Sequence, residues 1–94
     1  MNAEWDEKKR LSNLAKHKVD FARAALIFDG YVLELPQRKR DYSEERIGAL
    51  GKLDEEIVWV VYTWRGERRR IISARRARRD ERERYHQSLL QRPS

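Results

Sequence analysis

The 94 residues contain no internal repeat and suffice for one modest hydrophobic core, so we expect a single domain over residues 1–94. The absence of cysteine and the wide separation of the only two histidines exclude disulfides and thiolate metal sites and argue against structural zinc, so no metal and no cofactor are expected. No apolar run has the length of a signal peptide or a membrane span, which predicts a cytoplasmic location.

The net charge of +6 comes from one part of the chain. Residues 65–84 hold ten arginines and four acidic residues, whereas the first 64 residues hold eleven basic and twelve acidic ones. A concentrated arginine block is typical of a surface that binds phosphates or of one that docks an acidic protein. Composition leaves both interpretations open.

Hydrophobic spacing predicts two helices near the N-terminus. Apolar residues recur at helical spacing over residues 7–17, preceded by a short strand that ends at Trp5. Asp20 is a suitable N-cap for a second helix, whose apolar face runs to Phe28 before Asp29-Gly30 ends it.

The period then changes to that of strands. Pro36 is expected to stop the first strand, and the β-branched and aromatic run at 57–64 is expected to be a central strand covered on both faces. The predicted order is strand 31–35, loop 37–45, strands 46–52, 57–64 and 68–74, and a helix from Arg76 to about Leu90. These elements define an α+β fold: two N-terminal helices, a four-stranded antiparallel sheet, with or without the short N-terminal strand, and a C-terminal helix.

Two separated stretches resemble the signatures of a known family. WDEKKRLSNLAKHKVDF (Trp5–Phe21) is similar to the opening signature of the BrnT toxin family, and RIISARRARRDERERY (Arg70–Tyr85) is similar to its closing signature. Arg46 and Gly51 match the family's arginine and glycine between them. The chain departs from the family where Lys18 replaces a usual glycine and Arg78 replaces a common threonine.

The resemblance implies a RelE-like ribonuclease fold and a metal-independent endoribonuclease that inhibits translation as the toxin of a type II toxin–antitoxin system. It also implies a BrnA-type antitoxin with a ribbon-helix-helix DNA-binding part as the partner, operator DNA bound only through that complex, RNA as the substrate, and no contact with a membrane.

Such cleavage needs a base for the attacking 2′-hydroxyl, cations for the phosphorane and an acid for the leaving oxygen. Lys16 and His17, at the end of the first predicted helix, suit these roles because histidine exchanges protons near neutral pH. The alternative is that His17 only satisfies helix carbonyls and that Lys16 is solvated.

Arg70 and Arg75 flank Ile-Ile-Ser-Ala and suit a phosphate clamp. Strict alternation places them on opposite faces, so they share a site only if the strand ends or bulges near Ala74; otherwise one of them pairs with an acid. Ser73 is either a phosphate ligand or a polar strand residue.

Glu81 and Tyr85 share a helix face. Glu81 is expected to orient an arginine, while Tyr85 either contacts RNA or docks the helix. The remaining candidates for RNA binding are Lys9, Arg46, Arg76 and Arg79, with solvated helix charges as the alternative for Lys9 and the helix arginines. We expect Asn13 to bond the backbone, and Trp59, Tyr62 and Trp64 to be either core residues or a base-stacking platform.

Two other functions compete with the nuclease. A non-catalytic nucleic-acid-binding module would use the arginines alone and would tolerate substitution of His17. A protein-docking subunit would show no salt-dependent affinity for RNA.

Overall fold

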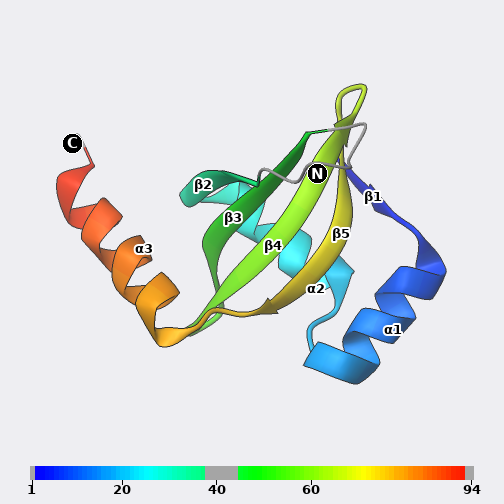
Figure 1. The fold of residues 1–94 in the computed structure, drawn as a ribbon, viewed down its shortest axis with the longest axis horizontal. Coiled ribbons are helices and arrows are strands. Elements are labelled where there is room, and N and C mark those ends of the chain that lie inside the picture. Colours follow the sequence, from blue (N-terminus) through cyan, green and yellow to red (C-terminus); the bar gives the residue numbers. More distant parts are fainter. Residues whose placement is uncertain (1, 38–44, 93–94) are drawn as a thin grey trace.

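The computed structural model describes residues 2–37 and 45–92, and its fold is α+β, as predicted (Figure 1). A five-stranded sheet forms the centre, with helices packed on both faces. No helix in these two ranges is long and apolar enough to cross a membrane. The elements in chain order are β1 (Ala3–Trp5), α1 (Glu7–His17), α2 (Phe21–Ala24), the 3-10 helix η1 (Ala25–Asp29), β2 (Val32–Gln37), β3 (Arg46–Leu53), β4 (Glu56–Arg65), β5 (Arg68–Arg76) and α3 (Arg79–Gln91).

The sheet has the order β1-β5-β4-β3-β2. Strands β2 to β5 form the predicted antiparallel meander, with β4 between β3 and β5. The short strand predicted to end at Trp5 is β1, which pairs in parallel with β5 and places Trp5 opposite Ile71. The four-stranded antiparallel sheet is thereby extended to a five-stranded mixed one.

Several boundaries differ from the prediction. The second helix tightens into η1 after Ala24, as helix ends often do. Strand β2 continues through Pro36 to Gln37, because an edge strand tolerates the missing N–H. Helix α3 begins at Arg79 rather than Arg76, because β5 runs on to Arg76. Most of the predicted loop 37–45 lies outside the described residues.

Strand β4 is buried on both faces, which confirms its predicted central position. On one face, hereafter the α2 face, Val58, Val60 and Tyr62 pack against α2 and η1. On the other, hereafter the α3 face, Ile57 and Trp59 pack beneath α3. The two cores together fix the helices relative to the sheet.

Helix α1 is defined by caps at both ends. The Asp6 carboxylate accepts hydrogen bonds from the backbone N–H groups of Lys8 (2.8 Å) and Lys9 (3.3 Å), and the Lys9 and Lys8 bonds hold the pKa of Asp6 below its usual value. At the other end Lys18 adopts a left-handed conformation with φ of 61°. Glycine adopts this conformation without strain, which explains its usual place at this position in the family that the sequence resembles.

Candidate active site

A bulge in β5 brings the two candidate arginines to one face of the sheet. In the register with β4, Val61 lies opposite Ser73 and Tyr62 lies opposite Ile71, so Ile72 is an extra residue. Ile71 and Ala74 consequently both point into the core of the α2 face, three residues apart. The residues that alternate with them lie on the α3 face, because they are opposite β4 residues of that face: Arg70 opposite Thr63, Ser73 opposite Val61 and Arg75 opposite Trp59. The bulge required for a shared site is therefore present, two residues before Ala74.

Arg75 is anchored from α3. Its guanidinium donates to both carboxylate oxygens of Glu81, at 2.8 and 2.9 Å, and also to the carbonyl oxygen of Arg76 at 3.1 Å. The paired guanidinium holds the pKa of the Glu81 carboxyl below its usual value, and Glu81 raises the pKa of Arg75. Since a guanidinium has five N–H donors, these three bonds leave donors for a phosphate.

The Glu81 carboxylate has a second role. One of its oxygens accepts the backbone N–H of Arg78 at 2.7 Å, which satisfies an otherwise unpaired donor at the start of α3. Arg78, which stands where threonine is common in the family that the sequence resembles, makes no side-chain cap hydrogen bond of its own, so Glu81 supplies the reciprocal half of the cap. The prediction that Glu81 orients an arginine agrees with this geometry.

Arg70 lies on the same face as Arg75 but is held by a residue of the edge strand β1. Glu4 of β1 lies beside it in the parallel register, and the Arg70 guanidinium donates to the Glu4 carboxylate at 2.8 Å. Both side chains are about one-third exposed. Sequence reasoning missed Glu4, although the alternation of Ala3 and Trp5 as apolar neighbours placed Glu4 on the other face. Ser73 lies between the two arginines along β5 and is half-buried.

Asn13, in the middle of α1, fixes this helix against the same part of β5. Its amide nitrogen donates to the carbonyl oxygens of Val19 (2.9 Å) and Ala74 (2.8 Å), and its amide oxygen accepts the Ala74 N–H at 3.1 Å. The prediction that Asn13 bonds the backbone is confirmed. Lys16 is exposed and His17 half-buried in the last turn of α1. His17 follows Asn13 by four residues, so both lie on the helix side that meets β5.

The other predicted RNA-binding cations are spread around the molecule. Lys9 is exposed in the first turn of α1. Arg46 begins β3 and is half-buried, with its Nε inaccessible to solvent. Arg79 is exposed on α3 and pairs with Glu83 at 3.3 Å. These three cations therefore lie on three different elements, α1, β3 and α3, rather than on β5 with Arg70 and Arg75.

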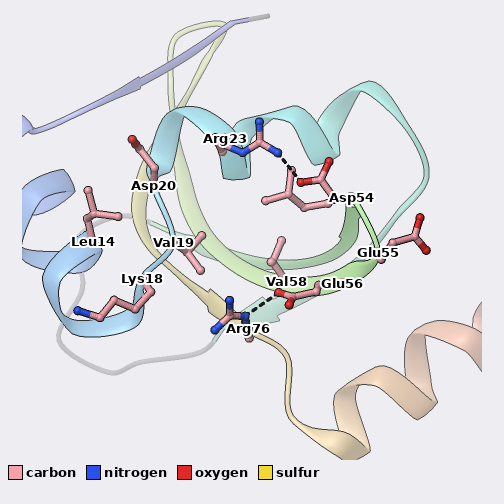
Figure 2. A pocket seen from close by; sticks show the side chains of 11 residues that line it. Leu14, Lys18, Val19, Asp20, Arg23, Asp54, Glu55, Glu56, Val58 and Arg76 are labelled. Atoms are coloured by element: carbon pink, nitrogen blue, oxygen red, sulfur yellow. Dashed lines mark hydrogen bonds and ion pairs between the residues drawn. The ribbon is translucent and has the colours of Figure 1, made fainter.

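Arg76 lies on the other face of the sheet from Arg75. Its guanidinium donates to the Glu56 carboxylate at 2.6 Å, as Figure 2 shows, at a groove of about 480 Å³ between the end of α1 and the β3–β4 turn. The floor of this groove is apolar and its rim carries charges of both signs. The structure therefore does not bring Arg76 into the site of Arg75, because neighbouring strand residues point to opposite faces.

Tyr85 docks α3 on the sheet. It is 4% exposed and its ring lies 5.8 Å from that of Tyr31. Burial raises the pKa of its hydroxyl. This position favours the docking alternative over direct contact with RNA.

Trp59, which the sequence left as either a core residue or a base-stacking platform, is a core residue that lies beneath the site. The Trp59 indole lies across Gly48, where an added Cβ would meet the ring at 1.9 Å, and the Arg75 guanidinium is 5.9 Å from the ring centre. Only a glycine at position 48 leaves room for this ring. The spacing of glycines along the predicted strand was the available signal.

The fold and charge define a small basic α+β protein with arginines on a partly open sheet face, an arrangement suited to a polyanion. The family model of the ribonuclease toxin BrnT, of type II toxin–antitoxin systems, matches residues 5–81. The chain therefore belongs to the BrnT family, and a type II toxin implies a protein antitoxin as its partner. A comparison with curated proteins gave no significant match.

Proposed function

We propose that this protein cleaves RNA without a metal ion on the α3 face of its sheet. The observation that carries the proposal is the β5 bulge, which places Arg70, Ser73 and Arg75 on one face, while Asn13 bonds α1 to the backbone of Ala74, between Ser73 and Arg75. Two guanidiniums on one face suit the doubly charged phosphorane of an in-line attack.

In the proposed reaction the RNA 2′-hydroxyl attacks the adjacent phosphorus and loses its proton to a base. The bond from phosphorus to the 5′-oxygen breaks, and that oxygen takes a proton from an acid. The products are a 2′,3′-cyclic phosphate and a 5′-hydroxyl. We assign the proton transfers to Lys16 and His17 and the stabilisation of the phosphorane to Arg75 and Arg70.

The proposed biological role follows from the family. RNA cleavage in the cytoplasm inhibits translation until a BrnA-type antitoxin, with a ribbon-helix-helix DNA-binding part, covers the site. The arginines favour an acidic segment on that partner. A RelE-like ribonuclease fold remains part of this proposal.

The experiment is cleavage of an end-labelled RNA by the purified protein in EDTA, beside Arg75→Ala and His17→Ala. We expect products ending in 2′,3′-cyclic phosphates, and loss of cleavage in both variants with RNA affinity retained within a few-fold. Cleavage that needs added metal would overturn the metal-independent mechanism. Binding without cleavage by the unmodified protein would leave a nucleic-acid-binding module instead.

A further inference from the structure

The β4–β5 hairpin presents one large aromatic side chain to solvent. Trp64, two residues before the turn at Gly66, is 46% exposed, whereas Trp59 is 9% and Tyr62 1% exposed. The sequence offered the same two alternatives, core residue or base-stacking platform, for all three aromatic residues. In the structure Trp59 and Tyr62 belong to the cores and Trp64 does not. Of these three aromatic residues, Trp64 is therefore the one whose ring a ligand can reach.

The orientation of Trp64 is fixed by its neighbours. The Arg69 guanidinium carbon lies 4.7 Å from the Trp64 ring centre, 4.2 Å from that of Phe28 and 5.3 Å from that of Tyr62. Tyr62 also meets Trp64 edge-on, at 5.6 Å and 88°. A stacking surface held in this way loses little rotational freedom when a ligand binds.

The charge of Arg69 is balanced by rings rather than by a carboxylate. Within the described residues it forms no ion pair, and its buried Nε has no hydrogen-bond acceptor. The Glu34 carboxylate accepts a hydrogen bond from the Tyr62 hydroxyl. The Trp64 surface is therefore backed by a positive charge, which favours an electron-rich, anionic ligand.

The surrounding turn strengthens this preference. Residues 65–70 contain four arginines and one glutamate, and Arg68 is exposed. Arg70, in the candidate active site, is in register with Thr63, whereas Trp64 is in register with Arg69, so Arg70 and Trp64 point to opposite faces of the sheet. The hairpin tip therefore carries basic side chains around the exposed ring of Trp64, which lies on the face of the sheet opposite Arg70.

We propose that the hairpin tip is a second RNA-binding subsite, in which an unpaired base stacks on Trp64 while Arg68 contacts a neighbouring phosphate. This inference rests on the proposed function for the identity of the ligand as RNA. The stacked base must be unpaired, because the faces of bases in a duplex are covered by their neighbours. An aromatic platform combined with arginines is how proteins hold single strands without reading their sequence.

The test measures binding separately from cleavage. The probe is a fluorescein-labelled 2′-O-methyl RNA of roughly 12 nucleotides, which lacks the attacking hydroxyl, and affinity is followed by anisotropy over a range of salt. Trp64→Leu removes the ring and keeps apolar bulk, whereas Trp64→Phe keeps a ring. Leu90→Ala removes another exposed apolar side chain, on α3, and thermal unfolding checks that each variant is folded.

We expect Trp64→Leu to weaken binding about tenfold with an unchanged salt slope, and Trp64→Phe and Leu90→Ala to bind like the unmodified protein. Arg68→Ala should lower the slope of log affinity against log salt by about 0.7, the share of one phosphate contact on a single strand. A duplex of the same sequence should not distinguish Trp64→Leu from the unmodified protein.

Unchanged affinity of a folded Trp64→Leu variant for the single strand would overturn the subsite. So would a loss confined to binding of a polyglutamate peptide, because the surface would then recognise acidic protein. Cleavage of unmethylated RNA separates the two proposals. Trp64-dependent binding without any cleavage refutes the nuclease and keeps the subsite, whereas cleavage with binding independent of Trp64 does the reverse.

Discussion

The Glu81 carboxylate holds the Arg75 guanidinium through two hydrogen bonds, at 2.8 and 2.9 Å. Because Glu81 also accepts the N–H of Arg78, its own position is fixed by the start of α3. The orientation of the central arginine of the proposed site therefore depends on a helix that follows it in the chain.

Glu81→Gln should lower the rate of RNA cleavage about tenfold to a hundredfold. The glutamine amide has one acceptor oxygen and cannot accept both guanidinium hydrogen bonds, and small misplacements of catalytic groups have effects of this size. Single-turnover cleavage measures the effect. Glu83→Gln is the matched control, because Glu83 pairs with the exposed Arg79 and not with Arg75. Equal rates for Glu81→Gln and the unmodified protein would show that Arg75 needs no anchor.

The same ion pair should make stability depend on pH. Arg75 lowers the pKa of the Glu81 carboxyl in the folded protein, so the resulting stability is fully present above the usual glutamate pKa and is lost as pH falls through the lowered value. The difference in free energy of unfolding between the unmodified protein and Glu81→Gln should therefore be constant near pH 7 and shrink below about pH 4. Urea unfolding at several pH values measures it. A difference that grew on acidification would contradict the direction of the pKa shift.

Asn13→Ala should destabilise the fold by about 3 kcal/mol, because it leaves the buried backbone groups of Ala74 and the Val19 carbonyl without partners. Ser12→Ala, on the exposed side of α1, is the control and should change stability by roughly 0.5 kcal/mol or less. Chemical denaturation gives both values. If the two variants were equally stable, Asn13 would not be what holds α1 to β5.

Lys18→Gly should stabilise the protein by about 1 kcal/mol, because glycine adopts the left-handed conformation of residue 18 without the cost that a Cβ brings. Ser12→Gly, in the interior of α1, should have the opposite sign and a similar size. Thermal unfolding distinguishes them. Destabilisation by both substitutions would mean that the conformation at Lys18 carries no strain.

Gly48→Ala should destabilise the protein by about 2 kcal/mol and reduce cleavage, since the new methyl group displaces the Trp59 ring next to Arg75. At Gly30 an added Cβ meets nothing within 4 Å, so Gly30→Ala should change neither property. Denaturation and RNA cleavage are measured on the same preparations. A stable, active Gly48→Ala variant would place Trp59 outside the site.

The helices and β4 were predictable because their hydrophobic residues recur with a regular period. The features that the sequence left open are those that depend on a break in the period or on a partner element. The bulge at Ile72 is marked only by the odd spacing of two buried residues, Ile71 and Ala74. That spacing is visible in the sequence, but it has meaning only when the partner strand is known. The same limit applies to Tyr85, since helical spacing cannot say that its face meets Tyr31.

The bonds from Asn13 to Ala74 also affect how the protein meets other chains. Unpaired N–H and C=O groups along a strand invite a strand from a second molecule to join the sheet, which is a common start of aggregation. Strand β1 pairs with β5 only as far as Ile71. Beyond it, the Asn13 amide of α1 forms hydrogen bonds with both the N–H and the carbonyl oxygen of Ala74. The length of β5 that carries Arg75 is thus closed to intermolecular strand pairing while its side chains stay open to a ligand.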